Sequence, residues 1–305
     1  MYNNKMANRR SFVKRTNKKN RTRNRINKKN RTRNRTKRIN QQGGAPNVKL
    51  VASFVGHDRG VSSVAFHPTA PLLATGSHDS TVKLWQLPSV QSSASLEATV
   101  TLEGHAGSVS SVAFHPTAPL LATGSHDSTV KLWQLPSVQS SASLEATVTL
   151  EGHAGSVSSV AFHPTAPLLA TGSDKTVKLW RLSSDNSSAT LERTLDGHTH
   201  FVSSVAFHPT APLLATGSND KTAKLWRFSP DGSTAVCVAT LEAHSGSVTS
   251  VAFHPTAPLL ATGSNDKTAK LWSFPSSLSE LTMLMLWREL GVPHTRNPFK
   301  YNATK

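Results

Sequence analysis

Short apolar segments alternate with polar turns along most of the chain. VSSVAFH (61–67) shows partial alternation of apolar residues, and LLATG (72–76) is a short apolar run that stops at a Gly-Ser-His-Asp turn. TVKLW (81–85) alternates strictly, and a serine-rich loop separates it from LEATVTL (96–102). Period-two alternation bounded by turn residues is typical of β-strands. The pattern therefore predicts four short strands in each unit of about 46 residues.

This unit occurs five times. The tryptophans Trp85, Trp133, Trp180, Trp226 and Trp272 follow one another at intervals of 48, 47, 46 and 46 residues. Residues 61–108 and 109–156 are identical at all 48 positions, which indicates a recent tandem duplication. One four-stranded sheet cannot bury both of its faces by itself, so we expect successive sheets to stack on one another.

The order Gly-His, VSSVAF, LLATGS, HD and TVKLW, repeated over residues 49–274, resembles the WD40 repeat, or WD-repeat, of β-propellers. The resemblance implies an all-β chain, a WD-repeat β-propeller with about five four-stranded blades. We therefore expect a disordered Lys/Arg/Asn-rich tail at 1–47, the propeller at 48–275 and a C-terminal extension with a short helix at 276–305.

The resemblance also implies a hydrogen-bonded chain of four side chains inside each blade: a histidine, a Ser or Thr, an aspartate and the tryptophan. The sets are His57, Asp79 and Trp85; His105, Asp127 and Trp133; His153, Asp174 and Trp180; His198, Asp220 and Trp226; and His244, Asp266 and Trp272. Two hydroxyls qualify in every repeat, in the order Thr75 or Ser77, Thr123 or Ser125, Thr171 or Ser173, Thr216 or Ser218, and Thr262 or Ser264. Buried polar groups must be paired, which gives these sets a structural role.

Ser, His and Asp can also form a hydrolytic site. An enzyme needs one such site, whereas this chain carries five copies, so we expect no enzyme, no catalytic residue, no cofactor and no metal. His198-Thr199-His200 is a single H-x-H, for which a surface turn is a sufficient explanation. The third repeat reads GSDKT where the others read GSHDST or GSNDKT, so we expect a tighter turn or an imperfect histidine contact there.

The sequence does not decide whether the five blades close into a ring. VKLVASF (48–54) matches a fourth strand and is expected to complete the last blade, giving a closed ring of five; an open arc and an arc completed by another chain are the alternatives. Ser279 as an N-cap and Gly291 beyond the end predict a helix over LTMLMLWREL (281–290). This helix either packs on the propeller or binds a partner or an exposed edge.

The net charge lies in the tail. The chain has a net charge of +17, and residues 1–41 hold 17 basic side chains and no acid. The densest part is expected to bind RNA or DNA without sequence preference, through Lys18, Lys19, Arg21, Arg23, Arg25, Lys28, Lys29, Arg31, Arg33 and Arg35. It reads equally well as a nuclear or nucleolar address, and less well as a contact with anionic membrane. One cysteine, no secretory signal and no membrane span favour an intracellular protein.

WD-repeat propellers mostly act as rigid platforms for other proteins, so the resemblance implies a non-catalytic scaffold that binds proteins or peptides on one face, with the tail for localisation. A nucleic-acid, chromatin or ribonucleoprotein-associated protein is the alternative. Partner-binding candidates are the variable turn residues at one end of the blades: Arg59, His78, His126, His200, Phe201, Asn219 and Asn265. Phe201 either anchors a partner or covers its own blade. An open ring would also permit self-association.

Overall fold

The computed structural model describes residues 50–88, 95–135, 144–229 and 234–274, and all of their regular structure is β-strand. After the short strand β1 (Ser53–Phe54), the chain forms five successive sheets. The first contains β2 (Val61–Phe66), β3 (Leu72–Ser77), β4 (Val82–Gln86) and β6 (Val100–Leu102), and β5 (Ser95–Leu96) precedes β6. The second contains β7 (Val109–Phe114), β8 (Leu120–Ser125), β9 (Val130–Gln134) and β10 (Val148–Leu150).

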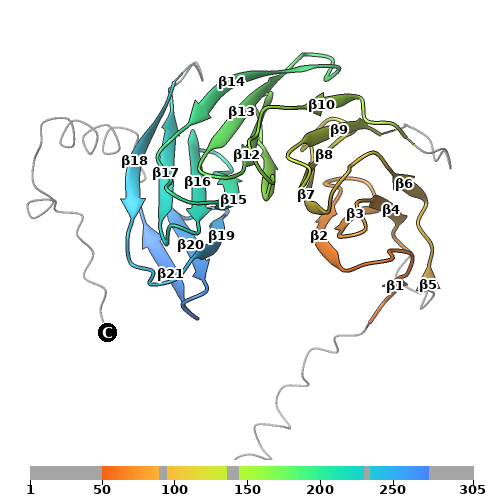
Figure 1. The fold of residues 1–305 in the computed structure, drawn as a ribbon, viewed down its shortest axis with the longest axis horizontal. Coiled ribbons are helices and arrows are strands. Elements are labelled where there is room, and N and C mark those ends of the chain that lie inside the picture. The colour runs from red at the N-terminus through yellow and green to blue at the C-terminus, as the bar shows by residue number, and fades with distance from the viewer. Residues whose placement is uncertain (1–49, 89–94, 136–143, 230–233, 275–305) are drawn as a thin grey trace, which may run out of the picture. The chain divides into compact units, whose positions relative to one another are not determined.

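The third sheet contains β11 (Ser159–Phe162), β12 (Leu168–Gly172), β13 (Val177–Leu182) and β14 (Ala189–Leu195). The fourth contains β15 (Val202–Phe207), β16 (Leu213–Ser218), β17 (Ala223–Phe228) and β18 (Ala235–Leu241). The fifth contains β19 (Val248–Phe253), β20 (Leu259–Ser264) and β21 (Ala269–Ser273), which makes three strands within the described residues. Neighbouring strands within each of these sheets are antiparallel, and Figure 1 shows the sheets following one another in chain order.

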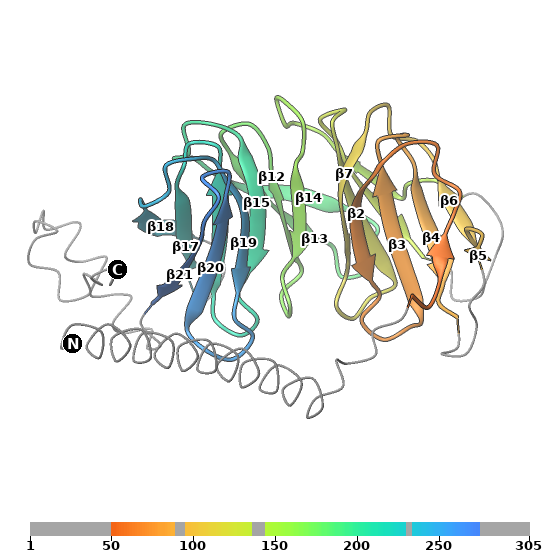
Figure 2. The ribbon, with the colours of Figure 1, turned by 90° about the horizontal axis from the view of Figure 1, so that it is seen from below.

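The register is the same in every sheet, because the sequence is nearly the same. Trp85 of β4 lies opposite Leu73 of β3, and Trp133 of β9 lies opposite Leu121 of β8. The tryptophan of each third strand is thereby placed beside the second strand, which carries the threonine of the same repeat. The FHPTAP turns join the first two strands at one end of each sheet. The loops that precede the first strand, and contain His57 and its counterparts, lie at the other end (Figure 2).

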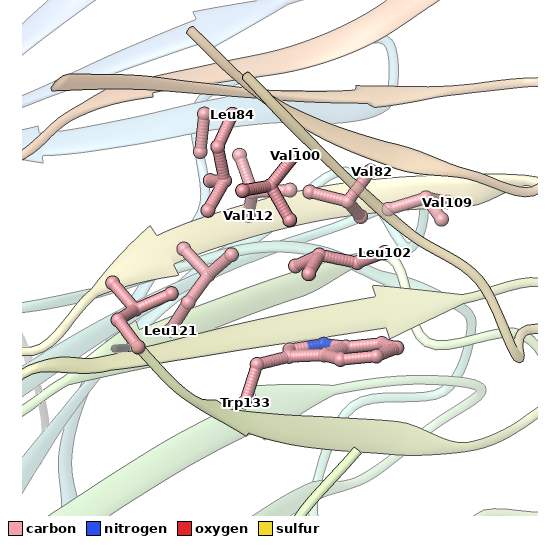
Figure 3. Packing of buried hydrophobic residues seen from close by; sticks show 10 residues of the cluster. Val82, Leu84, Val100, Leu102, Val109, Val112, Leu121 and Trp133 are labelled. Carbon is pink, nitrogen blue, oxygen red and sulfur yellow. The ribbon is translucent and has the colours of Figure 1, made fainter. Parts of the chain in front are cut away.

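The apolar core lies between successive sheets. The cluster between the first two sheets joins Val82, Leu84, Val100 and Leu102 of the first sheet to Val109, Val112, Leu121 and Trp133 of the second (Figure 3). Corresponding clusters join the second sheet to the third, the third to the fourth and the fourth to the fifth. Stacking of sheets is therefore the source of burial, as the repeat pattern predicts.

The prediction that VKLVASF completes the last blade is wrong for its described part. Ser53 and Phe54 pair in parallel with Ser95 and Leu96, and the ring of Phe54 lies 5.3 Å from that of Trp85 in the first sheet. An apolar segment does not specify which sheet edge it joins, and here an aromatic contact with the first sheet accompanies the pairing. The tail at 1–47 and the helix expected over 281–290 lie outside the described residues.

Candidate functional site

Two loops meet at one end of every sheet: the loop that follows His57 or its counterpart, and the turn between the second and third strands. We call this end of the sheets the histidine rim. In the first sheet it comprises residues 57–60 and 77–80, and the amide of His78 donates to the carbonyl of Gly60 at 2.9 Å. Equivalent bonds join His126 to Ser108, Asn219 to Phe201 and Asn265 to Ser247. The two loops of each such repeat are thus held together at the rim by backbone bonds.

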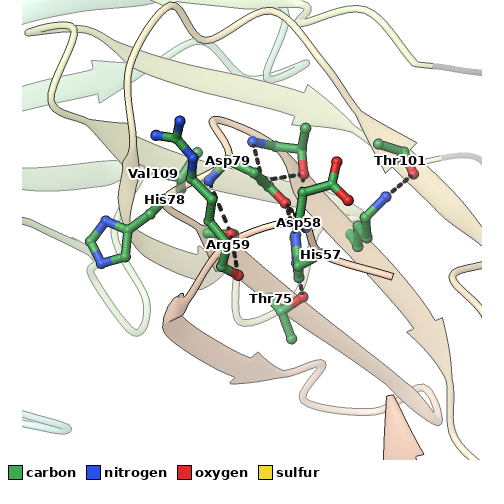
Figure 4. A network of polar contacts seen from close by, with 12 residues as sticks. His57, Asp58, Arg59, Thr75, His78, Asp79, Thr101 and Val109 are labelled. Carbon is green, nitrogen blue, oxygen red and sulfur yellow. Dashed lines mark hydrogen bonds and ion pairs between the residues drawn. The ribbon is translucent and has the colours of Figure 1, made fainter. Parts of the chain in front are cut away.

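Beneath the rim of the first sheet, four side chains form one hydrogen-bonded chain, and Figure 4 shows three of them, His57, Thr75 and Asp79. His57 Nδ1 is 2.8 Å from Asp79 Oδ2, and His57 Nε2 is 2.7 Å from Thr75 Oγ1. Trp85 Nε1 donates to the same Thr75 oxygen at 2.8 Å. Because a carboxylate only accepts, Nδ1 carries the imidazole proton and Nε2 accepts from the threonine hydroxyl. The donors therefore run from Trp85 through Thr75 and His57 to Asp79.

The same chain recurs in three further repeats, and the hydroxyl is the threonine each time. The sets are His105, Thr123, Asp127 and Trp133; His198, Thr216, Asp220 and Trp226; and His244, Thr262, Asp266 and Trp272. The serine two residues further along has another role. Ser125 Oγ accepts from the amide of Asp127 at 3.1 Å and donates to the carbonyl of Gly107 at 2.9 Å, which ties the turn to the histidine loop.

The network has one further member, a threonine, which was not expected from the sequence. Thr81 donates its hydroxyl to Asp79 Oδ1 at 2.7 Å and its amide to the same oxygen at 2.9 Å, and Thr129, Thr222 and Thr268 do the same with their aspartates. A threonine two residues after the aspartate was the available signal, and all five repeats have it, with Thr176 in the third. In the other four it holds the carboxylate in the rotamer that reaches the histidine.

These bonds set the protonation state of the network. Burial raises the pKa of the Asp127 carboxyl, but bonds from Thr129 and His105 outweigh burial and hold that pKa at about 2. Burial lowers the pKa of His105, and Asp127 opposes that shift. An ionised aspartate beside a neutral histidine follows at neutral pH, which agrees with the donor order derived from geometry.

The third repeat departs from the others. His153 Nε2 still contacts Thr171 Oγ1 at 2.6 Å, and Trp180 still donates to that oxygen at 2.8 Å, but His153 Nδ1 is buried and has no hydrogen-bond partner among the described residues. The turn is one residue shorter before Asp174, and Lys175, which follows the aspartate, lacks the positive φ that Ser80, Ser128, Lys221 and Lys267 have in the other turns. The Asp174 carboxylate instead lies where a side chain at Gly155 would be. The shorter turn thus directs the aspartate away from its histidine.

The loss of this contact predicts a pH dependence. Burial, with a contribution from the charge of Lys178, lowers the pKa of His153 to about 4, whereas an unfolded histidine titrates near 6.5. The unfolded chain therefore binds a proton first, and stability is lost as the pH falls through 6.5, until about pH 4. Between pH 7 and pH 5 this one group should reduce the unfolding free energy by about 2 kcal/mol.

Urea unfolding of the wild type and of His153→Gln at pH 7 and pH 5 measures this contribution. The variant should lose less stability on acidification than the wild type. His105→Gln is the matched control and should remove less of the pH dependence, because Asp127 counteracts the effect of burial on His105. Identical pH dependence in the wild type and His153→Gln would contradict the assignment.

The order Thr–His–Asp is also that of a hydrolytic triad. In the second repeat, however, Thr123 is fully buried, and its oxygen already accepts the indole proton of Trp133. Thr75, Thr171, Thr216 and Thr262 are buried as well. A nucleophile must reach a substrate, so these hydroxyls are placed to hold strands together rather than to attack.

The partner-binding candidates gather at the histidine rim. Arg59, His78, His126, His200, Phe201 and Asn265 are exposed, and Asn219 is half-buried. The Phe201 side chain is 41% exposed and lies beside the ring of His200, at a centroid distance of 5.5 Å. Ser108 and Ser156 donate to the carbonyls of His78 and His126 in the preceding sheets, so the rim is continuous across the first three sheets. The basic candidates from Lys18 to Arg35 lie outside the described residues.

Two further observations concern the described part of the chain. Its residues contain no group of three or more His, Cys, Asp or Glu side chains placed to hold a metal ion. A search of the same residues finds no helix with the length and apolar character needed to cross a membrane.

The chain is similar to known proteins on two levels. Residues 48–86, 96–134, 144–181, 189–227 and 235–273, more than half of the chain, match the WD domain, G-beta repeat family (WD40). One segment is 59% identical over 32 residues to coatomer subunit alpha-1 of Arabidopsis thaliana, and another match is 50% identical over 42 residues to coatomer subunit alpha-3 of Oryza sativa subsp. japonica. These cover 10% and 13% of this chain and 3% of either relative, about the length of one repeat. Because five repeats match the family and the chain forms five successive sheets, the chain belongs to the WD40 family of WD-repeat proteins.

Proposed function

We propose that this protein is a non-catalytic scaffold that binds other proteins through the histidine rim. The observation that carries the proposal is a contrast between the buried side chains, which repeat from sheet to sheet, and the exposed rim side chains, which vary. The buried sets under the rim recur almost unchanged, whereas the exposed residues above them differ from repeat to repeat. Position 59 is Arg in the first repeat and its counterpart is Gly107 in the second; Phe201 stands where Ser108 and Ser156 stand. Rigid elements that carry variable exposed side chains are suited to recognition.

Phe201 is the central residue of the proposed surface. Its ring is 41% exposed beside His200, and its carbonyl accepts from the amide of Asn219 at 2.8 Å, so its backbone is held while part of its ring faces solvent. A rigidly held aromatic side chain loses little conformational freedom on binding, which favours it as an anchor for a partner.

Two substitutions test the proposal with little risk to folding, because each introduces the residue that another repeat already has. A phage-displayed library of linear peptides, selected on the wild-type protein, supplies the probes. Arg59→Gly with Phe201→Ser should weaken the selected peptides at least tenfold. Thr117→Arg, on an exposed FHPTAP turn at the opposite end of the second sheet, is the control and should leave their affinity unchanged. Peptides that keep their affinity for the double variant but lose it for Thr117→Arg would overturn the proposal.

The basic tail supports a second candidate function, association with nucleic acid, because 17 basic residues in the first 41 match the charge of a phosphate backbone. We propose the same segment as a nuclear or nucleolar address. Deletion of residues 1–41 tests this second function. The deletion should abolish binding of a fluorescein-labelled mixed-sequence single-stranded RNA at 50 mM salt, and it should leave the affinities of the selected peptides unchanged. Loss of both activities would contradict the scaffold proposal.

A further inference from the structure

The four interfaces between successive sheets use the same contacts. At the second interface, Val157 of the third sheet sits on Gly124 of the second, so closely that a Cβ at Gly124 would be 2.7 Å from Val157 Cγ1. Ser110 donates to the carbonyl of Val157, and Ser111 Oγ accepts from the amide of Val160 at 3.1 Å.

A ring pair completes each interface near the FHPTAP turns: His115 lies 4.9 Å from Phe162, at a steep angle. The corresponding ring pairs are His67 with Phe114, His163 with Phe207 and His208 with Phe253. Corresponding glycines are Gly76, Gly172 and Gly217, and each would meet a valine of the following sheet. Every interface therefore joins the rear face of one sheet, with its glycine, serines and histidine, to the front face of the next, with its two valines and phenylalanine.

The front face of the first sheet carries this set of residues, and none of the described sheets covers it. Val61 is 52% exposed and Val64 is 62% exposed, whereas Val109 and Val112, at the same positions of the second sheet, are 0% and 6% exposed. Phe66 is exposed as well. Residues 61–108 and 109–156 have one sequence, so the neighbouring sheet alone accounts for the difference.

The rear face of the fifth sheet carries the complementary set. The nearest atom to a Cβ built at Gly263 is Ser250 Cβ at 3.9 Å, and no valine is within reach among the described residues. Leu271 is 67% exposed, whereas Leu132 at the same position of the second sheet is fully buried. Thr249 donates to the carbonyl of Gly263 at 3.3 Å, as Ser110 donates to that of Gly124 at 2.9 Å. Thr249, Ser250 and His254 thus occupy the positions of Ser110, Ser111 and His115.

We infer that the front face of the first sheet binds the rear face of the fifth sheet of a second copy of this chain. The docked pair would place Val61 on Gly263, the amide of Val64 on Ser250 Oγ, and the ring of Phe66 beside His254. The interface would be the one that the chain builds four times internally, so its complementarity is already demonstrated in the fold. The contact is head-to-tail, because each copy contributes a different face.

A second copy fits these faces better than the other end of the same chain. Within the chain, each valine is in tight van der Waals contact with the glycine of the preceding sheet, and interiors packed this closely resist a change of angle. Closing the ring on itself would have to alter all four internal interfaces, whereas docking of a second copy leaves them as they are. The exposed apolar front face provides the driving force.

Two substitutions, one on each face, test the inference on the full chain in 0.3 M salt, which screens the tail. Val64→Asp places a charge on the exposed front face, and Gly263→Val fills the space that Val61 would enter. Analytical ultracentrifugation should give the wild type a mass above the 32.8 kDa of one chain and each variant the mass of one chain. Leu191→Asp, an exposed site on β14 outside both faces, should associate like the wild type.

Mixing the two variants is the decisive arm. The Val64→Asp chain keeps an intact rear face and the Gly263→Val chain an intact front face, so an equimolar mixture should form a complex of two chains although neither variant associates alone. Circular dichroism confirms that both variants are folded. A wild type with the mass of one chain at all concentrations, association that survives both substitutions, or a mixture without complex would each overturn the inference. None of these results bears on peptide binding at the histidine rim, so the two proposals fail separately.

Discussion

Replacing Trp133 with alanine is expected to reduce the unfolding free energy by about 3–5 kcal/mol, and the same change at Trp272 by roughly half as much. Both tryptophans occupy the third-strand position, and both donate to a threonine, at 2.9 Å. Trp133 is fully buried in the cluster between the first two sheets, whereas Trp272 is half-buried in the last sheet. The hydrogen bond is thus common to the two sites, and the burial differs.

Urea unfolding followed by circular dichroism gives both values. The comparison separates the contribution of apolar burial from that of the hydrogen bond to threonine, because only the burial differs between the two positions. Equal losses at Trp133 and Trp272 would show that the greater burial of Trp133 adds little to stability, and would contradict the account of where the core lies.

Much of the fold and of the polar network is predictable from the repeats. Five copies in register fix the strand order, and the resemblance to the WD-repeat implies the buried sets of His, Asp and Trp. The choice between Thr75 and Ser77 is not predictable, since residues two apart on a strand point to the same face and both carry a hydroxyl. Distance along the strand decides: Thr75 reaches His57 and Trp85, and Ser77 reaches the carbonyls of the loop at the rim.

Features that depend on a neighbour are less predictable. The segment that ends at Phe54 reads as a fourth strand, but its sequence does not reveal which edge it joins, and in the structure it lies with the first sheet. Likewise the valines of β2 and β7 belong to identical sequences and differ only in what covers them. The short turn of the third repeat, in contrast, is predictable, because a single missing residue in the sequence predicts that His153 loses its contact with the aspartate.

The second large effect concerns the threonine at the centre of each set. Thr123→Val is nearly isosteric but removes the hydroxyl that donates to His105 Nε2 and accepts from Trp133 Nε1, at 2.8 and 2.9 Å. Both nitrogens would be left unpaired in a buried site, where each unsatisfied group costs about 1–3 kcal/mol. We expect a combined loss of about 2–5 kcal/mol of unfolding free energy. The exposed Thr117 in the same repeat is the matched control, and Thr117→Val should change stability by less than about 0.5 kcal/mol.

The unfolding free energy of Thr123→Val is also the most direct measurement of whether the His, Thr, Asp and Trp sets are structural. If they are, the variant is destabilised by the stated amount, and at temperatures where it is still folded it binds the selected rim peptides as the wild type does. A Thr123→Val protein as stable as the wild type, with its peptide binding or a hydrolytic activity lost, would contradict the account.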